Sequence, residues 1–374
     1  MPDENTSGAE DRLQSADSPS AQHVPPRRRR RSQGRRSDSY AALDLGTNNC
    51  RLLIAKPTAS GFRVIDSYSK VVRLGAGLSS TGQLSEHSMD LAVDAIKHCA
   101  KKIGSRNVKR WRCVATQACR QASNGEGFLK RVKEETGISL EVISARVEAR
   151  LSVMGCLNLI DVDKDVVLVV DIGGGSTELS WVDIRRLREE KGVMRVHRPP
   201  ISAWASLPLG VVTLTEQVPE HEDREAWYLE MKTKIKQAIS DANCSDRFTK
   251  VFGAGGGHII GTSGTITSLA AVHLDLPFYQ RDKVDGLWMD SDHVVKIARE
   301  MGGRTPQERA AFPSIGTDRA TLLVAGCAIM DVLCEMWPAQ KIRVADRGLR
   351  EGILMGLMQQ SQKIELVKKN GPAE

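Results

Sequence analysis

Two stretches of the sequence place an aspartate just before a glycine turn at the end of an apolar run. They are ALDLGTNNCRLLIA at residues 42–55 and VVDIGGGSTELSWV at residues 169–182. Glycine is costly inside a strand, so the three consecutive glycines of the second stretch predict a turn where the backbone approaches another group closely. Glycine-rich turns present backbone N–H groups that can bind phosphate oxygens. The two stretches therefore predict a pair of phosphate-binding turns.

The aspartates of the turns, Asp44 and Asp171, can bring two carboxylates to opposite sides of one cleft. Mg²⁺ prefers one or two carboxylates together with substrate oxygens and water, so this pattern fits a magnesium ion held against a phosphate chain. One Asp-x-Gly turn alone also occurs in ordinary hairpins, and the prediction depends on having two with the same flanking pattern. A third turn of small residues, GTSGT at 261–265, supports it, although this turn can also be read as a tight strand-to-helix junction.

Strands and helices alternate around these turns. Apolar patterns predict a strand–turn–strand unit at 40–57 and another at 165–184, with further strands at 61–74, 110–116 and 139–144. Helical periodicity predicts helices that begin after Ser85 and end at Gly104, and others at 127–137, 147–160 and 225–242. Alternation of this kind predicts an α/β fold. Because each copy of the turn motif opens an α/β half, we expect a duplicated fold of two domains with a ligand cleft between them.

Length and composition limit the class of protein. A chain of 374 residues has room for two domains, and its eight cysteines show no metal-binding spacing, which predicts a reduced, cytoplasmic protein. No apolar stretch approaches the length of a membrane span, so no membrane partner is expected. The net charge of +7 favours polyanionic partners.

Residues 1–38 differ from the rest of the chain. They are rich in small and polar residues and carry PPRRRRRSQGRR at 25–36, which predicts a disordered basic tail. The arginines at 27–31 can attract a polyanion, and a tail that only aids solubility is the alternative interpretation.

From about residue 40 to residue 357 the chain resembles the exopolyphosphatase and guanosine pentaphosphate phosphohydrolase (Ppx/GppA) family. General actin-like ATPases and sugar kinases share the two aspartate turns but not the other motifs. The motifs that carry the resemblance occur in family order: DLGTNNCRLL (44–53), RLGAGLSSTGQLS (73–85), VATQACRQASNGEGFLKRV (114–132), EVISARVEARL (141–151), DIGGGSTEL (171–179), LPLGVVTLTE (207–216), GTSGTITSLA (261–270) and GLREGILMG (348–356).

The resemblance implies the two-lobed actin/sugar kinase/Hsp70-like (ribonuclease H-like) α/β fold with an interdomain cleft. It places domain I at 39–150 and domain II at 151–347, followed at 348–374 by a C-terminal helix that packs back on domain I and then a tail. It also identifies the chain as similar to the short form of the family, without the C-terminal HD-type domain of longer members.

The resemblance also implies roles for individual residues. Glu148 corresponds to the catalytic base that activates water, and Asp44, Asp171 and Glu178 to the carboxylates of the metal site. We expect like-charge repulsion to raise the pKa of Glu148. Without the family context, Glu148 reads only as an acidic residue at a helix start. With the third turn included, the expected phosphate-binding residues are Gly46, Thr47, Asn48, Arg51, Arg120, Gly173, Gly174, Gly175, Ser176, Thr177, Gly264 and Thr265.

The implied reaction is hydrolysis of a phosphoanhydride. It would release terminal phosphate from inorganic polyphosphate or convert pppGpp to ppGpp, with Mg²⁺ as the cofactor, Mn²⁺ as its alternative, and a homodimer as the assembly. A nucleotide-dependent kinase of the same fold and a non-catalytic polyphosphate or nucleic-acid binder are the alternatives. Ala145 and Val147 stand where the family usually has Gly and Glu, and Val147 keeps the binder open as an alternative.

The aromatic residues and histidines add two structural expectations. Trp111, Trp204, Trp227, Trp288 and Trp337 are expected as core anchors, because no basic residues are interleaved with them. His258 is expected in a loop, because it follows a run of glycines and belongs to no zinc-type set.

Overall fold

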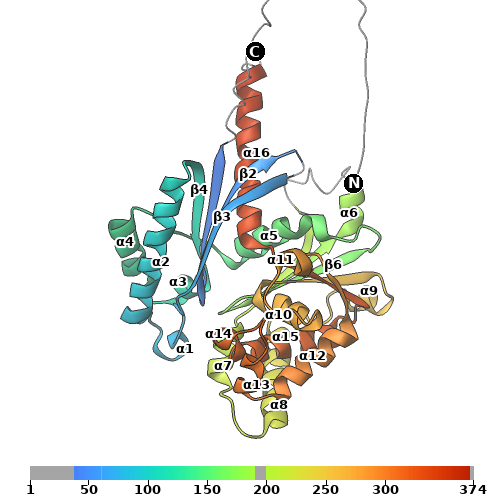
Figure 1. Ribbon diagram of the computed structural model, residues 1–374. Helices are drawn as coiled ribbons and strands as arrows, with labels where there is room; N and C mark the ends of the chain where they lie inside the picture. Colours follow the sequence, from blue (N-terminus) through green and yellow to red (C-terminus); the bar gives the residue numbers. More distant parts are fainter. Residues whose placement is uncertain (1–37, 60, 190–198, 371–374) are drawn as a thin grey trace, which may run out of the picture. The chain divides into compact units, whose positions relative to one another are not determined.

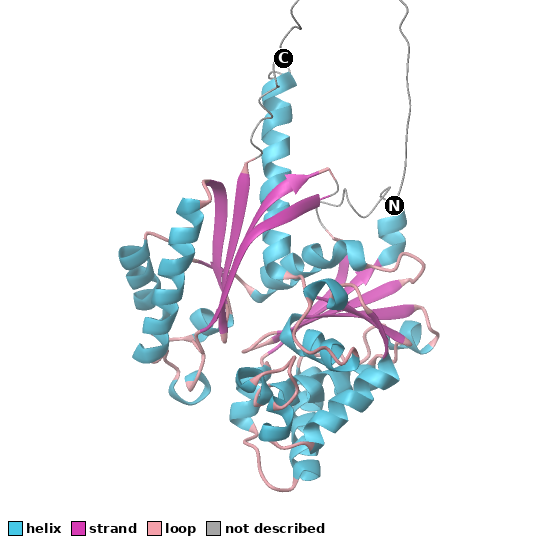
Figure 2. Ribbon diagram, in the orientation of Figure 1, coloured by secondary structure: helices cyan, strands magenta, loops and turns pink. Residues whose placement is uncertain are grey.

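The computed structural model describes residues 38–59, 61–189 and 199–370, and these belong to one compact unit. Two β-sheets form its framework, with helices on their outer faces and between them (Figure 1; Figure 2). The basic tail expected at residues 1–38 lies outside the described residues except for Asp38. None of the described helices combines the length and the apolar character needed to span a membrane.

The first sheet has five strands in the order β3-β2-β1-β4-β5. β1 runs antiparallel to β2 and parallel to β4, so the first aspartate turn is the loop of a hairpin. The strands are β1 (Ser39–Leu45), β2 (Asn49–Thr58), β3 (Gly61–Val71), β4 (Val108–Ala115) and β5 (Glu141–Val142).

The second sheet has six strands in the order β10-β11-β9-β6-β7-β8. β6 runs antiparallel to β7 and parallel to β9, as β1 does to β2 and β4. The second sheet thus repeats the order of the first, with β10 added at one edge, and this confirms the predicted duplicated α/β fold. Its strands are β6 (Val166–Ile172), β7 (Thr177–Asp183), β8 (Ile201–Leu207), β9 (Gly257–Thr262), β10 (Trp288–Asp290) and β11 (Lys341–Ala345).

Helices connect the strands and cover both sheets (Figure 1). The helices are α1 (Leu78–Thr81), α2 (Glu86–Ser105), α3 (Gln117–Gln121), α4 (Gly125–Thr136), α5 (Ala145–Cys156), the 3₁₀ helix η1 (Leu157–Leu159), α6 (Ile184–Glu189), α7 (Val211–Gln217), α8 (Arg224–Asp241), α9 (Thr249–Gly253), α10 (Ser263–His273), α11 (Arg281–Val284), α12 (Ser291–Gly303), α13 (Pro306–Ala310), α14 (Thr317–Ala320), α15 (Leu323–Met336) and α16 (Leu349–Asn370).

Side-chain alternation along β1 decides which way Asp44 faces. Ala41 and Leu43 pack in the apolar cluster that contains residues of α2 and α4. Tyr40 and Ala42 pack instead with residues of α5 and α16. Because side chains alternate along a strand, Asp44 continues the second series and faces the side of the sheet that carries α5.

The same alternation operates in β6. Leu168 and Val170 pack in the large cluster of the second sheet, whereas Val167 and Val169 pack with residues of α5 and η1. Asp171 continues the series that faces α5. Helix α5 therefore lies between the two sheets, and both aspartates face it.

Helix α5 packs closely against α16. A Cβ atom at Gly155 would collide with the carbonyl of Gly348, and a Cβ atom at Gly352 would collide with that of Leu151, so this crossing requires glycine on both helices. Helix α16 runs from Leu349 to Asn370, and α5 begins and ends earlier than predicted. The expected domain boundary at residue 150 falls within α5, and the domain limits stay predictions.

Two expectations about single residues are wrong. Trp227 and Trp337 are buried, but Trp111 is 49% exposed and Trp204 is 41% exposed, because they occupy outward positions on β4 and β8. His258 is buried within β9 rather than placed in a loop, because the pairing of β9 with β6 begins already at Gly257.

Candidate active site

The two glycine turns have the same backbone geometry and touch each other. The N–H of Gly46 donates to the carbonyl of Asn49 at 2.9 Å, and the N–H of Gly173 donates to that of Ser176 at 2.9 Å. A Cβ atom added at Gly174 would lie 3.0 Å from the Cβ atom of Thr47. Glycine at this position therefore lets the turns of the two sheets pack directly together.

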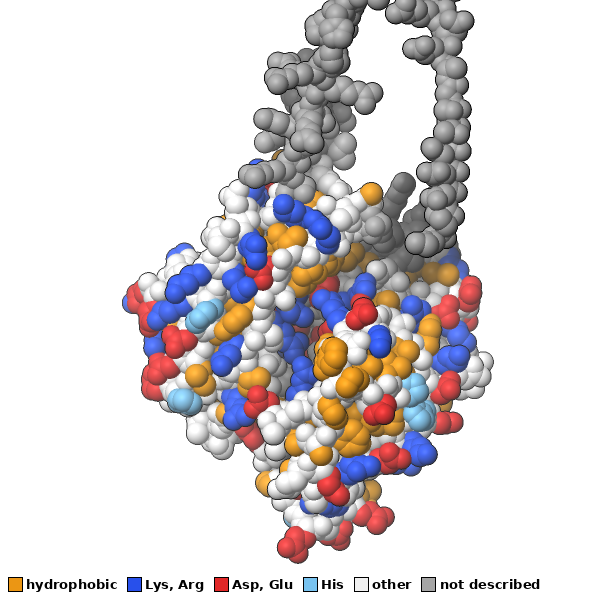
Figure 3. Space-filling view, viewed as in Figure 1, with side chains coloured by type: hydrophobic (Ala, Val, Ile, Leu, Met, Phe, Trp, Pro, Cys, Tyr) orange, Lys and Arg blue, Asp and Glu red, His pale blue; other side chains and the backbone are white. Residues whose placement is uncertain are grey.

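A cavity of about 590 Å³ opens beside these turns, between the two sheets. The space-filling view shows a hollow at this place with Lys and Arg side chains along it (Figure 3). Of the residues expected at the site, the cavity is lined by Asp44, Gly46, Thr47, Asn48, Arg51, Glu148, Asp171, Gly173, Gly174, Gly175, Ser176, Gly264 and Thr265.

Three expected residues do not line the cavity. Thr177 is buried, and its hydroxyl donates to the carbonyl of Leu209 at 2.7 Å. Arg120 and Glu178 instead contact groups that form or support the cavity wall.

Asp44 has an oxygen that is free to bind. Its Oδ1 is buried and has no hydrogen-bond partner among the described residues. Burial raises the pKa of Asp44 to about 6, while the positive charges of Arg51 and Arg350 oppose this rise. A buried acceptor without a donor is unfavourable, so Asp44 is suited to an incoming cation or donor.

Asp171 is held by hydroxyl groups at both oxygens. The hydroxyl of Ser263 donates to Oδ1 at 2.7 Å, and the hydroxyl of Ser152, on α5, donates to Oδ2. Ser263 has a φ of 74°, a left-handed conformation that is uncommon for a residue with a side chain. The third small-residue turn is therefore both the junction of β9 with α10 and part of the cavity, and its strained residue orients Asp171.

Glu148 lies in the first turn of α5, where the Ser144 hydroxyl accepts from the backbone N–H of Val147 and caps the helix. Arg120 donates to Oε2 of Glu148 at 3.2 Å and to the carbonyl of Ile143 at 2.6 Å. The pKa of Glu148 is raised well above its ordinary value, first by burial and then by the neighbouring carboxylate of Glu178, and Arg120 opposes the rise. The direction of this pKa shift agrees with the expectation from the sequence. Its leading cause, however, is burial rather than like-charge repulsion.

Glu178 is a buried carboxylate behind this part of the wall. Its Oε1 accepts from the hydroxyl of Ser176 at 2.7 Å and from that of Ser206 at 2.9 Å. Burial and the nearby Asp171 raise the pKa of Glu178 to about 7, and the two hydroxyl hydrogen bonds lower it.

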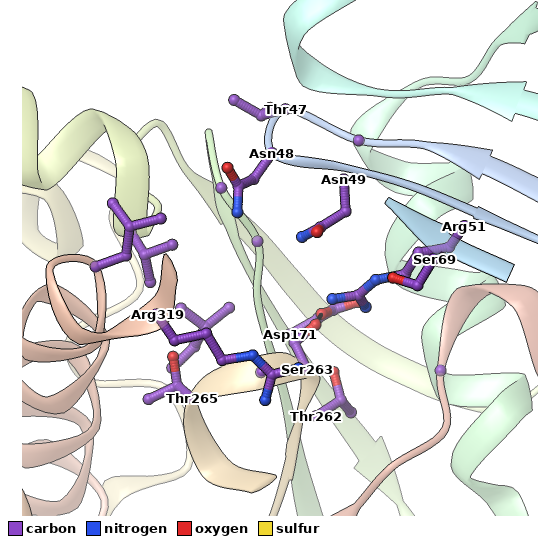
Figure 4. A pocket seen from close by; sticks show the side chains of 18 of the residues that line it. Thr47, Asn48, Asn49, Arg51, Ser69, Asp171, Thr262, Ser263, Thr265 and Arg319 are labelled. Carbon is purple, nitrogen blue, oxygen red and sulfur yellow. Dashed lines mark hydrogen bonds between the residues drawn. The ribbon is translucent and has the colours of Figure 1, made fainter. Parts of the chain in front are cut away.

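Three guanidinium groups of the cavity have no salt-bridge partner. The side chains of Arg51, Arg319 and Arg350 line it and make no hydrogen bond or salt bridge with a described residue. Burial and the charge of Arg350 lower the pKa of Arg51. Arg51 and Arg319 extend from opposite sides toward the space beside Asp171 (Figure 4).

Sequence reasoning missed Arg319 and Arg350 as members of the site. Arg319 belongs to the short helix α14, and its guanidinium lies over the ring of Tyr279 with 6.0 Å between the guanidinium carbon and the ring centroid. Arg350 lies at the start of α16, inside the motif GLREGILMG. That motif was the only feature of the sequence that could have indicated a role for Arg350 in the site. Val147, one of the two departures from the family pattern, packs against the apolar cluster around α16 and does not line the cavity.

The donor set of the cavity fits a hydrated divalent cation. Among the described residues there is no group of three or more His, Cys, Asp or Glu side chains arranged to hold a metal ion. The carboxylates of Asp44 and Asp171 both line the cavity, and Oδ1 of Asp44 has no hydrogen-bond partner among the described residues. Mg²⁺ commonly uses one or two carboxylates and takes its other ligands from water and substrate, so Asp44 and Asp171 suit such an ion.

Comparison with known proteins agrees with this geometry. Residues 53–361 match the model of the Ppx/GppA phosphatase family. A family member from Aquifex aeolicus is 28% identical with a TM-score of 0.70, and the alignment covers 87% of this chain and 98% of that one. An exopolyphosphatase-like protein is 26% identical with a TM-score of 0.75 and coverages of 87% and 99%. An exopolyphosphatase from Cytophaga hutchinsonii shares the fold at 22% identity and a TM-score of 0.74, with coverages of 86% and 98%.

Proposed function

The chain belongs to the Ppx/GppA phosphatase family, and we propose that it hydrolyses the terminal phosphoanhydride bond of inorganic polyphosphate or of pppGpp. Family membership supports a phosphatase-type activity in general. The choice between these substrates, the mechanism and the roles of individual residues belong to the proposal.

The observation that carries the proposal is the charge pattern of the cavity. Three guanidinium groups that make no hydrogen bond or salt bridge with a described residue line the same cavity as the carboxylates of Asp44, Glu148 and Asp171. Arginine binds phosphate oxygens through charge-assisted hydrogen bonds, and cations without protein partners are expected where a multiply charged anion binds. The acids beside them supply the groups that phosphoryl transfer to water requires.

In the proposed mechanism Glu148 acts as the general base. A water molecule attacks the terminal phosphorus, its proton passes to Glu148, and the bridging P–O bond breaks with its electron pair on the leaving phosphate chain. The raised pKa of Glu148 makes its carboxylate a stronger proton acceptor than that of an ordinary glutamate. Arg120, hydrogen-bonded to Glu148, holds the carboxylate in place.

The glycine turns and the arginines position the phosphate chain. Backbone N–H groups of the turns and the guanidinium groups of Arg51, Arg319 and Arg350 neutralise the charge that develops on the phosphate oxygens. Asp44 and Asp171 would hold Mg²⁺ or Mn²⁺, which supplies further neutralisation of phosphate charge when bound. The homodimer, the cytoplasmic location and the contact of the Arg-rich tail with polyanions also stay predictions.

Release of free phosphate tests the proposal. Wild-type protein, Glu148→Gln and the surface control Glu300→Gln would be assayed on polyphosphate and on pppGpp with Mg²⁺ or Mn²⁺. We expect Glu148→Gln to lower the rate by about 10²- to 10⁴-fold, because a positioned base contributes this much, and Glu300→Gln to match wild type. Equal rates for wild type and Glu148→Gln would remove Glu148 as the base.

Two outcomes would favour the alternatives. Consumption of ATP with transfer of labelled phosphate to an acceptor would indicate a kinase. Tight binding of polyphosphate without release of phosphate from either substrate would indicate a non-catalytic binder.

A further inference from the structure

A second cavity, of about 440 Å³, lies at the other end of the second sheet. The active-site residues Asp171 and Thr262 stand at the carboxyl ends of the parallel strands β6 and β9. The second cavity is lined by residues from the amino ends of β9 and β11 and from the segment that follows η1. Because the two cavities occupy opposite ends of the same strands, the second is a separate place in the molecule.

His258 presents a buried donor to this cavity. Its side chain is 1% exposed, and its Nε2 accepts a hydrogen bond from the backbone N–H of Asp161 at 3.1 Å. A backbone N–H can only donate, so Nε2 carries no proton. Burial lowers the pKa of His258 to about 4, so the ring is neutral near pH 7 and its proton resides on Nδ1. Nδ1 has no hydrogen-bond partner among the described residues.

Arg343 presents a second buried donor. It pairs with Trp288 across β10 and β11, and its guanidinium carbon lies 4.8 Å from the centroid of the Trp288 ring. The ring of His258 contacts the same Trp288 ring edge-on, with 5.4 Å between centroids. The Nε atom of Arg343 is buried and also has no hydrogen-bond partner among the described residues.

The strand register explains why these groups share one face. Arg343 of β11 is paired with Ile260 of β9, and His258 lies two residues before Ile260 on the same strand. Side chains two residues apart on a strand point to the same face, so His258 and Arg343 both lie on the side of the sheet that η1 covers. The side chains of His258 and Arg343, each with one buried donor that has no partner among the described residues, thus line one cavity.

The charge of the cavity is positive. Lys164, Lys341 and Arg343 line it, against the single carboxylate of Asp161. The ammonium of Lys164 donates to the carbonyl of Gly255 at 3.0 Å, whereas Lys341 is exposed and forms no ion pair with a described residue. An anion with several acceptor oxygens can accept from both buried donors and balance this charge.

We propose that this second cavity is a binding site for a phosphate-type oxyanion. The Nδ1–H of His258 and the Nε–H of Arg343 donate to its oxygens, and Lys341 closes the open side with its positive charge. Trp288 holds the guanidinium of Arg343 in position. This site is independent of the proposed function, since none of its residues lines the candidate active site.

Titration of the full chain, labelled with ¹⁵N-histidine, tests the proposal. Inorganic phosphate is the probe, sodium chloride at equal ionic strength is the reference, and sodium acetate tests a carboxylate. The His258 ring signals are assigned by their loss in His258→Gln or, if that variant does not fold, by their through-space contacts with Trp288. We expect a saturable shift of these signals with phosphate, a weaker response to acetate and none to chloride.

Charge variants separate this site from phosphate binding elsewhere. Arg343→Gln and Lys341→Gln should each weaken the phosphate response of His258 by about tenfold, because each removes a charged partner of the anion. The matched control Lys296→Gln, an exposed lysine of α12, should leave it unchanged. No saturable shift of His258, an equal response to chloride or acetate, or an unchanged response in both Arg343→Gln and Lys341→Gln would overturn the proposal.

Discussion

The two aspartate hairpins have the same backbone geometry, but the residue paired with the aspartate is basic in one and acidic in the other. Asp44 of the first hairpin is paired across the strands with Arg51, whereas Asp171 of the second is paired with Glu178. In each hairpin the partner follows the aspartate by seven residues, so Arg51 and Glu178 occupy equivalent positions. The first hairpin therefore places an acidic residue beside a basic one at the cavity, whereas the second places two acidic residues together, of which only Asp171 lines the cavity.

The two aspartates also differ in how many of their carboxylate oxygens already accept hydrogen bonds. Oδ1 of Asp44 has no hydrogen-bond partner in the described part of the chain, but both oxygens of Asp171 accept hydroxyl hydrogen bonds. The duplicated fold thus supplies two equivalent places for a carboxylate. The side chains brought next to each place decide whether that carboxylate is free to bind or is held in a network.

Asp44→Asn should have the largest effect among the tests of this comparison. It removes the charge of the free acceptor, and we expect phosphate release to fall by about 10²- to 10³-fold while the half-saturating metal concentration rises. Phosphate release measured over a range of Mg²⁺ concentrations checks this, with the exposed Asp94→Asn as a control. If Asp44→Asn has the wild-type rate and the wild-type metal dependence, the free oxygen of Asp44 is not a ligand of the cation.

The two-acid hairpin should make stability depend on pH. The pKa of Glu178 is raised from 4.5 to about 7 in the folded state, so between these values the folded protein binds more protons than the unfolded chain. The free energy of unfolding should therefore fall as pH rises through this window, by up to about 3 kcal/mol at 1.36 kcal/mol per pKa unit.

Glu178→Gln should flatten this dependence, because a glutamine does not titrate. Denaturant unfolding at several pH values between about 4.5 and 7 measures the slope for the variant, the wild type and Glu300→Gln. Asp44, whose pKa is raised to about 6, also contributes to the slope of the unfolding free energy against pH. This contribution should persist in Glu178→Gln below pH 6. Identical slopes for Glu178→Gln and wild type would contradict the assigned role of Glu178.

Equivalent glycines of the two turns should respond differently to a methyl group. A Cβ atom at Gly46 would lie 3.6 Å from the carbonyl oxygen of Asn49, an ordinary contact, whereas one at Gly173 would lie 2.9 Å from that of Ser176. We expect Gly173→Ala to lower the free energy of unfolding by about 1–3 kcal/mol, as overpacking does. Gly46→Ala is the internal control, and an equal loss in both variants would contradict the difference between the turns.

The smallest effect is expected at the ion pair between Arg73 and Asp318, which links the two sides of the cavity at 3.4 Å. Its side chains are 63% and 67% exposed, so solvent screens the pair. Arg73→Ala should change the free energy of unfolding by less than about 0.5 kcal/mol. A loss above 1 kcal/mol, measured by urea unfolding, would mean that exposed contacts rather than the packed glycine turns hold the two sides together.

Much of the fold and part of the site could be predicted because they depend on residues close together in the chain. Alternation of apolar residues predicts the strands, the Asp-x-Gly spacing predicts the hairpins, and their repetition predicts the duplicated fold. Errors arose where burial decides the outcome, as for Trp111 and Trp204, since a strand residue faces solvent or core according to what the other elements cover.

The amino-acid order alone was enough to predict the two turns and the carboxylates that end their strands, because a hairpin is built from adjacent residues. Docking of distant segments was needed to bring Arg319 and Arg350 beside Arg51 with no salt-bridge partner among the described residues, since these segments lie about 270 to 300 residues from Arg51 in the chain. It also decided that Ser152 and Ser263 hold Asp171 while Asp44 stays free. Hydrogen bonding and burial depend on the packed neighbours of a group, and those neighbours come from distant parts of the chain.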